Sequence, residues 1–190
     1  MRISKILLLV STLFALSSTA QADLLLEPYL GYTIGSGDRG NFDYDYKTPQ
    51  IGGRVGYQML GLMLGVDYSM GLGSFDVDAE HKVTGAETSS KNKKNQLGVF
   101  VGYNLPVLLR VWGTYYVNTS LETEGTPSSD YSGSGYALGA GFTGLPFVSL
   151  NLEYRNFSYD EVEIGSTKST LDPELEFSEI FLSVSLPLTF

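Results

Sequence analysis

Apolar side chains alternate with polar or small ones along most of the chain. In the last segment every second residue is apolar from Ile180 to Phe190, with Glu179 and Ser183 among the residues on the other face. A period of two is typical of a β-strand whose two faces meet different surroundings. The alternation recurs and predicts an all-β protein of eight strands, at residues 24–34, 49–59, 62–71, 95–103, 107–117, 133–143, 147–157 and 179–190.

Two kinds of linker join these segments. Short turns are expected at residues 60–61, 104–106 and 144–146. They alternate with long polar loops, expected at residues 35–48, 72–94, 118–132 and 158–174. Strand lengths cluster near the roughly 9 to 11 residues that a tilted strand needs to cross a bilayer. The pattern therefore predicts an eight-stranded antiparallel up-and-down transmembrane β-barrel with surface loops at one end and short turns at the other.

The N-terminus has the features of a secretory signal peptide. Two basic residues precede the apolar run 6–16, and Ala20-Gln21-Ala22 supplies a small-x-small cleavage site. The apolar run is shorter than the roughly 20 residues of a membrane-spanning helix. We therefore expect a cleaved signal peptide at residues 1–22 and a single barrel domain at residues 23–190.

Ionisable residues within the expected strands share one face. They are Glu27, Arg54, Asp67, Arg110, Glu153, Arg155 and Glu179. Glycines crowd the same face and leave room for long side chains in a narrow lumen. Because buried charges must be paired to be tolerated, we interpret this face as a lumen ionic network, with the apolar face toward lipid. A soluble lipocalin-like carrier would turn its apolar face inward, and alternation alone does not separate the two arrangements.

Aromatic residues of the apolar face fall at two levels. Those beside the short turns or the C-terminus are Tyr57, Tyr103, Phe142 and Phe190, and those near the long loops are Tyr32, Tyr68, Tyr115, Tyr136 and Tyr154. Tyrosine and other aromatic residues gather at the two interfaces of a membrane. The two levels therefore predict two aromatic girdles.

Composition narrows the function classes. The chain has 22 glycines, 13 tyrosines and 10 phenylalanines, which suit strands and tight turns. It has no cysteine, which excludes a disulfide or a thiolate metal site. The net charge is −9 and becomes more negative once the basic signal peptide is removed, which argues against a nucleic-acid partner.

Catalytic and metal-binding patterns are weak. The single histidine, His81, lies in an expected loop with acidic and serine residues nearby and no strand to fix their geometry. The loop acids Asp43, Asp45, Asp76 and Asp78 suit calcium by atom type, as do Glu161 and Glu163, but they lack EF-hand spacing. We expect no enzyme activity, no cofactor and no metal site.

The chain resembles the small outer-membrane barrels of the OmpA and OmpX type. It is also similar to the broad outer membrane protein beta-barrel domain group, which includes opacity-type surface antigens. The resemblance rests on the signal peptide, the eight-strand alternation, the three short turns and the ending Leu182-Ser-Val-Ser-Leu-Pro-Leu-Thr-Phe190. It implies that the barrel-assembly machinery recognises the last strand, through Val184, Leu186, Leu188 and Phe190.

These inferences predict a monomeric, integral protein of a bacterial outer membrane. Its expected partners are membrane lipid, lipopolysaccharide, the assembly machinery and an unidentified extracellular partner reached by long acidic loops. The expected role is structural or surface interaction, such as adhesion or envelope integrity. A narrow channel for ions or small solutes is the alternative, although side chains fill the interior of a barrel of this size.

Overall fold

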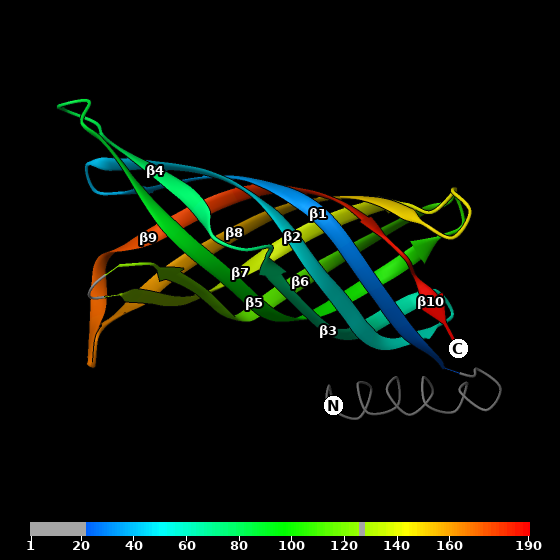
Figure 1. The fold of residues 1–190 in the computed structure, drawn as a ribbon. Coiled ribbons are helices and arrows are strands. Elements are labelled where there is room, and N and C mark those ends of the chain that lie inside the picture. Colours follow the sequence, from blue (N-terminus) through cyan, green and yellow to red (C-terminus); the bar gives the residue numbers. More distant parts are fainter. Residues whose placement is uncertain (1–21, 126–127) are drawn as a thin grey trace, which may run out of the picture.

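The computed structural model describes residues 22–125 and 128–190, so the predicted signal peptide lies almost wholly outside the described residues. Strands of one antiparallel sheet wrap into a barrel and run obliquely to its long axis (Figure 1). The strands are β1 (Asp23–Arg39), β2 (Phe42–Met59), β3 (Leu62–Gly71), β4 (Phe75–His81), β5 (Glu87–Leu105), β6 (Leu109–Thr123), β7 (Ser129–Phe142), β8 (Ser149–Ile164), β9 (Thr167–Ser185) and β10 (Leu188–Thr189). Among the described residues, no helix is long and apolar enough to cross a membrane.

The strands occupy eight positions around the ring. β3 and β4 both pair with β2 and β5, so they form one interrupted strand with a break at residues 72–74. β9 and β10 both pair with β1, which also pairs with β2 and thereby closes the barrel. The prediction of an eight-stranded antiparallel up-and-down barrel is confirmed.

The two ends of the barrel differ in their connections. The short-turn end carries the β2–β3, β5–β6 and β7–β8 turns together with β10 (Figure 1). Leu60 and Gly61 have φ values of 51° and 85°, the left-handed pair that a two-residue hairpin turn requires. The other end carries the hairpins β1–β2, β4–β5, β6–β7 and β8–β9. We call the part of the barrel between those hairpins and the level of Tyr32 the distal half, and the remainder the proximal half.

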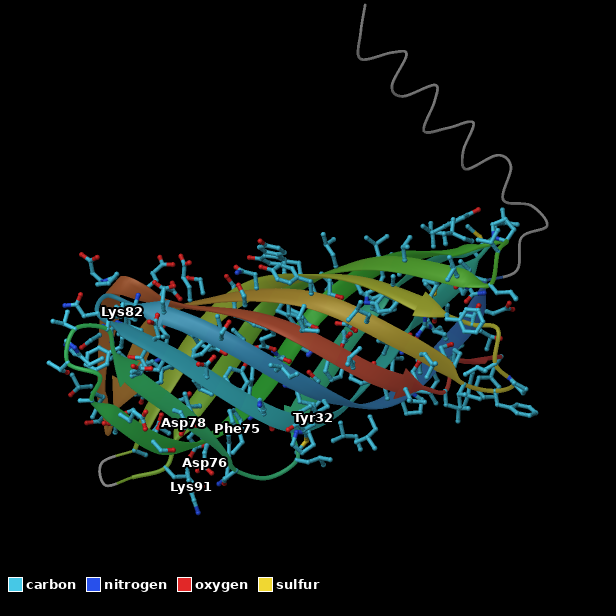
Figure 2. All side chains as sticks on the ribbon, turned by 90° about the horizontal axis from the view of Figure 1, so that it is seen from above. Tyr32, Phe75, Asp76, Asp78, Lys82 and Lys91 are labelled. Atoms are coloured by element: carbon cyan, nitrogen blue, oxygen red, sulfur yellow. The ribbon has the colours of Figure 1, made fainter. Side chains whose placement is uncertain are left out.

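The long loops predicted at residues 35–48, 72–94, 118–132 and 158–174 are wrong. Strands continue through most of these segments, and the connections shrink to residues 40–41 between β1 and β2, 82–86 between β4 and β5, and 165–166 between β8 and β9. The distal half is therefore an ordered extension of the barrel wall. Figure 2 shows Tyr32 partway along the barrel and Lys82 near its hairpin end.

An inversion of the two faces explains the error. In the proximal half apolar residues such as Val66 and Val99 face outward, and Arg54 is buried inside. In the distal half Tyr46 and Phe177 are buried inside, and polar residues face outward. The apolar positions thus shift by one residue between the halves, and a search for outward apolar residues ends each strand too early.

Smaller boundaries also differ from the sequence prediction. The turn expected at residues 104–106 lies at residues 106–108. The last strand, expected to be continuous over residues 179–190, is interrupted at residues 186–187. Leu186 is half-buried there and its N–H donates to the Pro28 carbonyl at 2.9 Å. Pro28 and Pro187 carry no N–H, so the hydrogen-bond ladder weakens at this point.

Large apolar side chains cover the outside of the proximal half in a continuous belt. We expect Val99→Arg, at the middle of this belt, to reduce the free energy of unfolding in lipid vesicles by about 2 to 4 kcal/mol. Ser89→Arg is the matched control, because Ser89 faces outward on the same strand in the polar distal half. Denaturant titration of the refolded variants measures both effects. Equal tolerance of the two arginines would contradict the assignment of the belt to lipid.

Candidate functional site

The proximal lumen centres on one arginine. Arg54 Nε donates to Asp67 at 2.8 Å, its Nη2 contacts Glu153, and its Nη1 lies 3.7 Å from Glu27. The guanidinium also lies 4.4 Å from the centre of the Trp112 ring. The arginine and its three carboxylate partners are at most 2% exposed. Arg54 on β2 thus links its own strand to three others, β1, β3 and β8.

Two more arginines extend this arrangement along the lumen. Arg110 forms a bidentate pair with Glu27, one contact being 2.8 Å from Nη1 to Oε2. Arg155 Nε donates to Glu153 at 2.9 Å, and its Nη1 donates to the side-chain oxygens of Gln50 at 2.9 Å and Gln96 at 3.2 Å. A continuous chain of charges therefore runs along the proximal lumen from Arg110 to Arg155.

Glycines on the inner face create the space for this chain. A Cβ on Gly139 would lie 2.2 Å from the Trp112 ring, and a Cβ on Gly52 would lie 2.5 Å from the Tyr29 ring. Tyr29 in turn donates its hydroxyl to Asp67 at 2.6 Å. Small residues on some strands thus accommodate the large aromatic and cationic side chains that reach across from others.

Sequence reasoning missed Lys94. This lysine is 2% exposed, contacts the Glu179 carboxylate, and lies 2.8 Å from the Tyr46 hydroxyl. Glu179, expected among the arginines, therefore has its direct ion pair with Lys94. Lys94 lies two residues before Gln96 and four before Gly98, which were both assigned to the inward face. Because side chains alternate along a strand, extending this alternation toward the N-terminus would have predicted that Lys94 also faces inward.

The aromatic residues expected in girdles point away from the lumen. All of them are exposed in the absence of lipid, namely Tyr32, Tyr57, Tyr68, Tyr103, Tyr115, Tyr136, Phe142, Tyr154 and Phe190. Tyr115 and Tyr136 are direct cross-strand partners on β6 and β7. Tyr115 and Tyr136 therefore lie side by side on the outer surface, and the two girdles stay a prediction.

The C-terminal strand seals against β1. Phe190 N–H donates to the Leu24 carbonyl at 3.0 Å, and Leu24 N–H donates to the Phe190 carbonyl at 2.9 Å. Val184 points outward, whereas Leu186 and Leu188 are half-buried near the interrupted part of the strand. The side chains expected to form the assembly signal thus do not share one uniform outward face.

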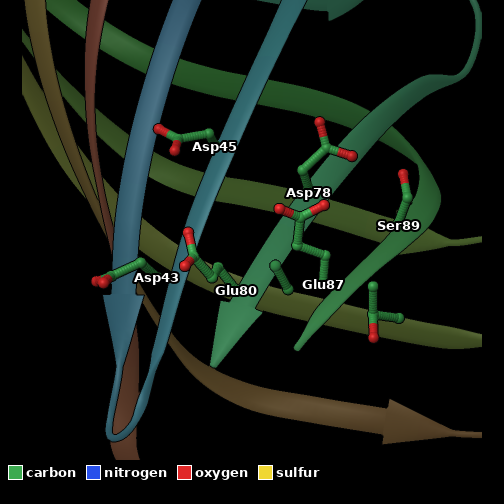
Figure 3. Close-up of a pocket in the computed structure, with 8 residues that line it drawn as sticks. Asp43, Asp45, Asp78, Glu80, Glu87 and Ser89 are labelled. Atoms are coloured by element: carbon green, nitrogen blue, oxygen red, sulfur yellow. The ribbon is translucent and has the colours of Figure 1, made fainter. Parts of the chain in front are cut away.

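Outward carboxylates of the distal half lie opposite one another. We define the acidic face as Asp43, Asp45, Asp78, Glu80 and Glu87 on β2, β4 and β5 (Figure 3). Asp43, Glu80 and Glu87 form one cross-strand row, and Asp45 pairs with Asp78 in the next. Like charges directly opposed on a sheet are destabilising. Within the described ranges no group of three or more candidate side chains is arranged to hold a metal ion.

A similar row lies on β6, β7 and β8. Asp130 is the cross-strand partner of both Glu122 and Glu163. Partial burial and, after it, repulsion from these two carboxylates raise the pKa of Asp130. Because a raised carboxyl pKa favours the protonated folded state, Asp130 destabilises the fold at neutral pH, and acidification through its folded-state pKa relieves this effect.

His81 has a local structural contact. Its Nδ1 accepts hydrogen bonds from the backbone N–H groups of Val83 at 3.2 Å and Thr84 at 3.3 Å. The ring also lies edge-on to Phe42, with 4.9 Å between centroids. Through these contacts His81 stabilises the β4–β5 turn.

The buried arginine network can be tested by removing one charge. We expect Arg54→Met to reduce the free energy of unfolding by about 3 to 5 kcal/mol, because it leaves buried carboxylates without their cation. Lys168→Met is the control, since Lys168 and Glu163 form an exposed pair at 3.6 Å that should contribute at most about 1 kcal/mol. Urea titration in detergent micelles compares them. A similar small effect of both variants would show that the network is not essential for stability.

Repulsion between the carboxylates of the acidic face can be tested by removing the charge of one of them. Glu80→Gln should stabilise the barrel, because Glu80 lies between Asp43 and Glu87. The difference in free energy of unfolding between the variant and the wild-type protein should become smaller at high salt, because salt screens the repulsion in the wild-type protein. Ser89→Gln on the same sheet face serves as the control for side-chain size. A gain independent of salt would mean that charge repulsion is not its cause.

Comparisons with known proteins agree with this architecture. Neisserial surface protein A is 16% identical with a TM-score of 0.54, covering 87% of this chain and 98% of that one. Ail, the attachment invasion locus protein of Yersinia pestis, is 12% identical with a TM-score of 0.57, covering 87% and 99%. OprG of Pseudomonas aeruginosa is 12% identical with a TM-score of 0.50, covering 89% and 97%. These likenesses concern the fold.

A search of the curated protein sequences finds no match. The model of the outer membrane protein beta-barrel domain family matches residues 6–186, which is most of the chain. Together with the closed antiparallel barrel, this match establishes an integral protein of the outer membrane. The chain belongs to the outer membrane protein beta-barrel domain family.

Proposed function

We propose that this protein is a non-enzymatic outer-membrane barrel whose distal half is a rigid surface for contacts outside the cell. The supporting observation is that the strands continue beyond the outer tyrosines with an apolar interior and a polar exterior. From Tyr32 to Arg39 the chain advances about 23 Å along β1, at roughly 3.3 Å per residue. A projection of this kind presents its outer side chains at fixed positions.

The proposed orientation follows the rule for this class of barrel. Short turns face the periplasm and the opposite end faces the exterior. Lipid and lipopolysaccharide then surround the apolar belt, and the aromatic residues at its two edges lie at the membrane interfaces. The C-terminal strand, which pairs with β1 at Leu24, is proposed as the segment that the assembly machinery recognises, and the closed barrel acts as a monomer.

Charge constrains the kind of extracellular partner. Ail is described in complex with a heparin analogue, sucrose octasulfate. The acidic face of this chain would repel such a polyanion, because its carboxylates are exposed and closely spaced. We therefore propose a contact with a neutral or cationic surface. The paired charges and the aromatic cluster that fill the lumen argue against the alternative function, a narrow open channel for ions or small solutes.

Single cysteines can test which end faces the exterior, because the chain has none of its own. Thr84→Cys on the β4–β5 turn should react with a membrane-impermeant maleimide in intact cells. Gly144→Cys, on a short turn, should react only after the outer membrane is permeabilised. The reverse pattern would overturn the proposed orientation.

Cell adhesion then tests the role itself. A non-adherent Gram-negative strain that expresses the protein should be retained several-fold better on immobilised extracellular-matrix protein than the parent strain. A variant with Asp43→Asn and Glu80→Gln should lose part of this gain if the acidic face makes the contact. Lys168→Met controls for surface change elsewhere. Unchanged retention of all strains, with normal surface labelling, would reject surface interaction in favour of an envelope-structural role.

A further inference from the structure

Buried polar atoms without a protein partner are unevenly distributed along the barrel. Among the described residues, those atoms belong to Thr33, Gln50, Gln96, Arg110, Trp112, Thr114, Tyr116, Ser149, Arg155 and Glu179. Most of them lie in the proximal lumen, and Thr33 and Glu179 lie at its border. Tyr116 belongs to the aromatic cluster beyond that border, but its ring lies only 5.8 Å from the Arg155 guanidinium of the proximal lumen. Buried polar groups in proteins are normally satisfied by protein or by internal water. Their concentration here indicates that the proximal lumen is hydrated.

The interior of the distal half has the opposite character. Several of its buried polar groups are satisfied by one another: the hydroxyls of Thr119 and Tyr159 lie 3.0 Å apart, and Thr123 donates to Asn92 at 2.6 Å. Asn92 itself donates to the Ser90 carbonyl at 2.9 Å. These four side chains therefore need no water.

Aromatic and aliphatic side chains fill the rest of this interior. Ring centroids lie 5.2 Å apart for Tyr46 and Phe75, 5.3 Å for Tyr46 and Phe177, and 6.1 Å for Tyr159 and Phe177. Leu121 and Leu175 belong to the same buried cluster. We call this cluster, above the Lys94–Glu179 pair, the apolar layer. Its members come from β2, β4, β6, β7, β8 and β9.

A cavity of about 290 Å³ lies at the short-turn end. It is lined by the apolar residues Leu25, Met63 and Pro187 and by the polar residues Gln58, Asn104, Arg110 and Thr143, and the polar side offers water a route to the proximal lumen. Arg110 also carries an Nε without a partner among the described residues. Polar side chains thus continue from this opening into the lumen.

We propose that the apolar layer, and not the arginine network, is the barrier that keeps the barrel closed to ions. Below it lies a hydrated, blind-ended lumen that opens toward the short turns. The physical basis is that a narrow apolar constriction expels water and so blocks ions, whereas a polar lumen holds water. The barrel is thereby a latent ion pathway closed at one level. This inference is independent of what contacts the distal exterior.

Planar-bilayer conductance tests the barrier. Phe75→Ser with Phe177→Ser should hydrate the apolar layer and raise the ion conductance of the refolded barrel by about tenfold or more. Gln50→Ala with Gln96→Ala removes side-chain atoms from the proximal lumen and should leave conductance at the wild-type level. Circular dichroism and heat-modifiability verify the fold of each. Folded serine variants that conduct no more than wild type, or glutamine variants that conduct equally, would overturn the proposal.

Silver-ion reactivity tests hydration without disturbing the aromatic residues. Thr114→Cys lies in the proximal lumen and Leu121→Cys in the apolar layer, and both native side chains are buried. In vesicles, Ag⁺ added on the short-turn side should modify the first thiol at least about tenfold faster than the second. Equal rates, or protection of both thiols in folded protein, would contradict a hydrated lumen beneath a dry barrier.

Discussion

The pairing of β1 with β2 on one side and with β9 and β10 on the other is the constraint on which the molecule depends. Lipid offers no hydrogen-bond partner, so a sheet can cross it only when its two edges meet. The backbone bonds between Leu24 and Phe190 complete the ring at the short-turn end. Closure also makes an enclosed lumen, whose side chains must satisfy one another or hold water.

Closure leads to two different interiors because the surroundings of the wall change along its length. Where the exterior is lipid, polar side chains gather inside, and three arginines are balanced by three carboxylates, namely Arg54, Arg110 and Arg155 by Glu27, Asp67 and Glu153. Where the exterior is aqueous, the apolar side chains turn inward and Phe177 packs among rings. The chain thus combines a membrane barrel with an ordinary soluble barrel on the same strands. The interior chemistry changes at Lys94 and Glu179.

Periodicity predicted the fold class and the inward position of the ionisable residues in the proximal strands, because one face there is consistently apolar. It failed where the apolar face changes sides: Tyr44 and Tyr46 alternate with Asp43 and Asp45 as regularly as in any strand, yet we expected a loop. Lys94 was missed for the same reason, because it lies in the segment 72–94 that we also expected to be a loop. The interruption at Leu186 required knowing that Pro28 lies opposite, which depends on strand register and so on long-range pairing.

The inversion of faces limits how the exposed end of this barrel can change in length. Removing a single residue from β2 above Lys47 would rotate Tyr44 and Tyr46 outward and bring their acidic neighbours into the dry interior. We therefore expect insertions and deletions to be accommodated in pairs, matched on the adjoining strand, or within connections such as residues 82–86. The outer surface of the distal half should therefore vary mainly by substitution of its outward side chains, while the lengths of the strands stay constant.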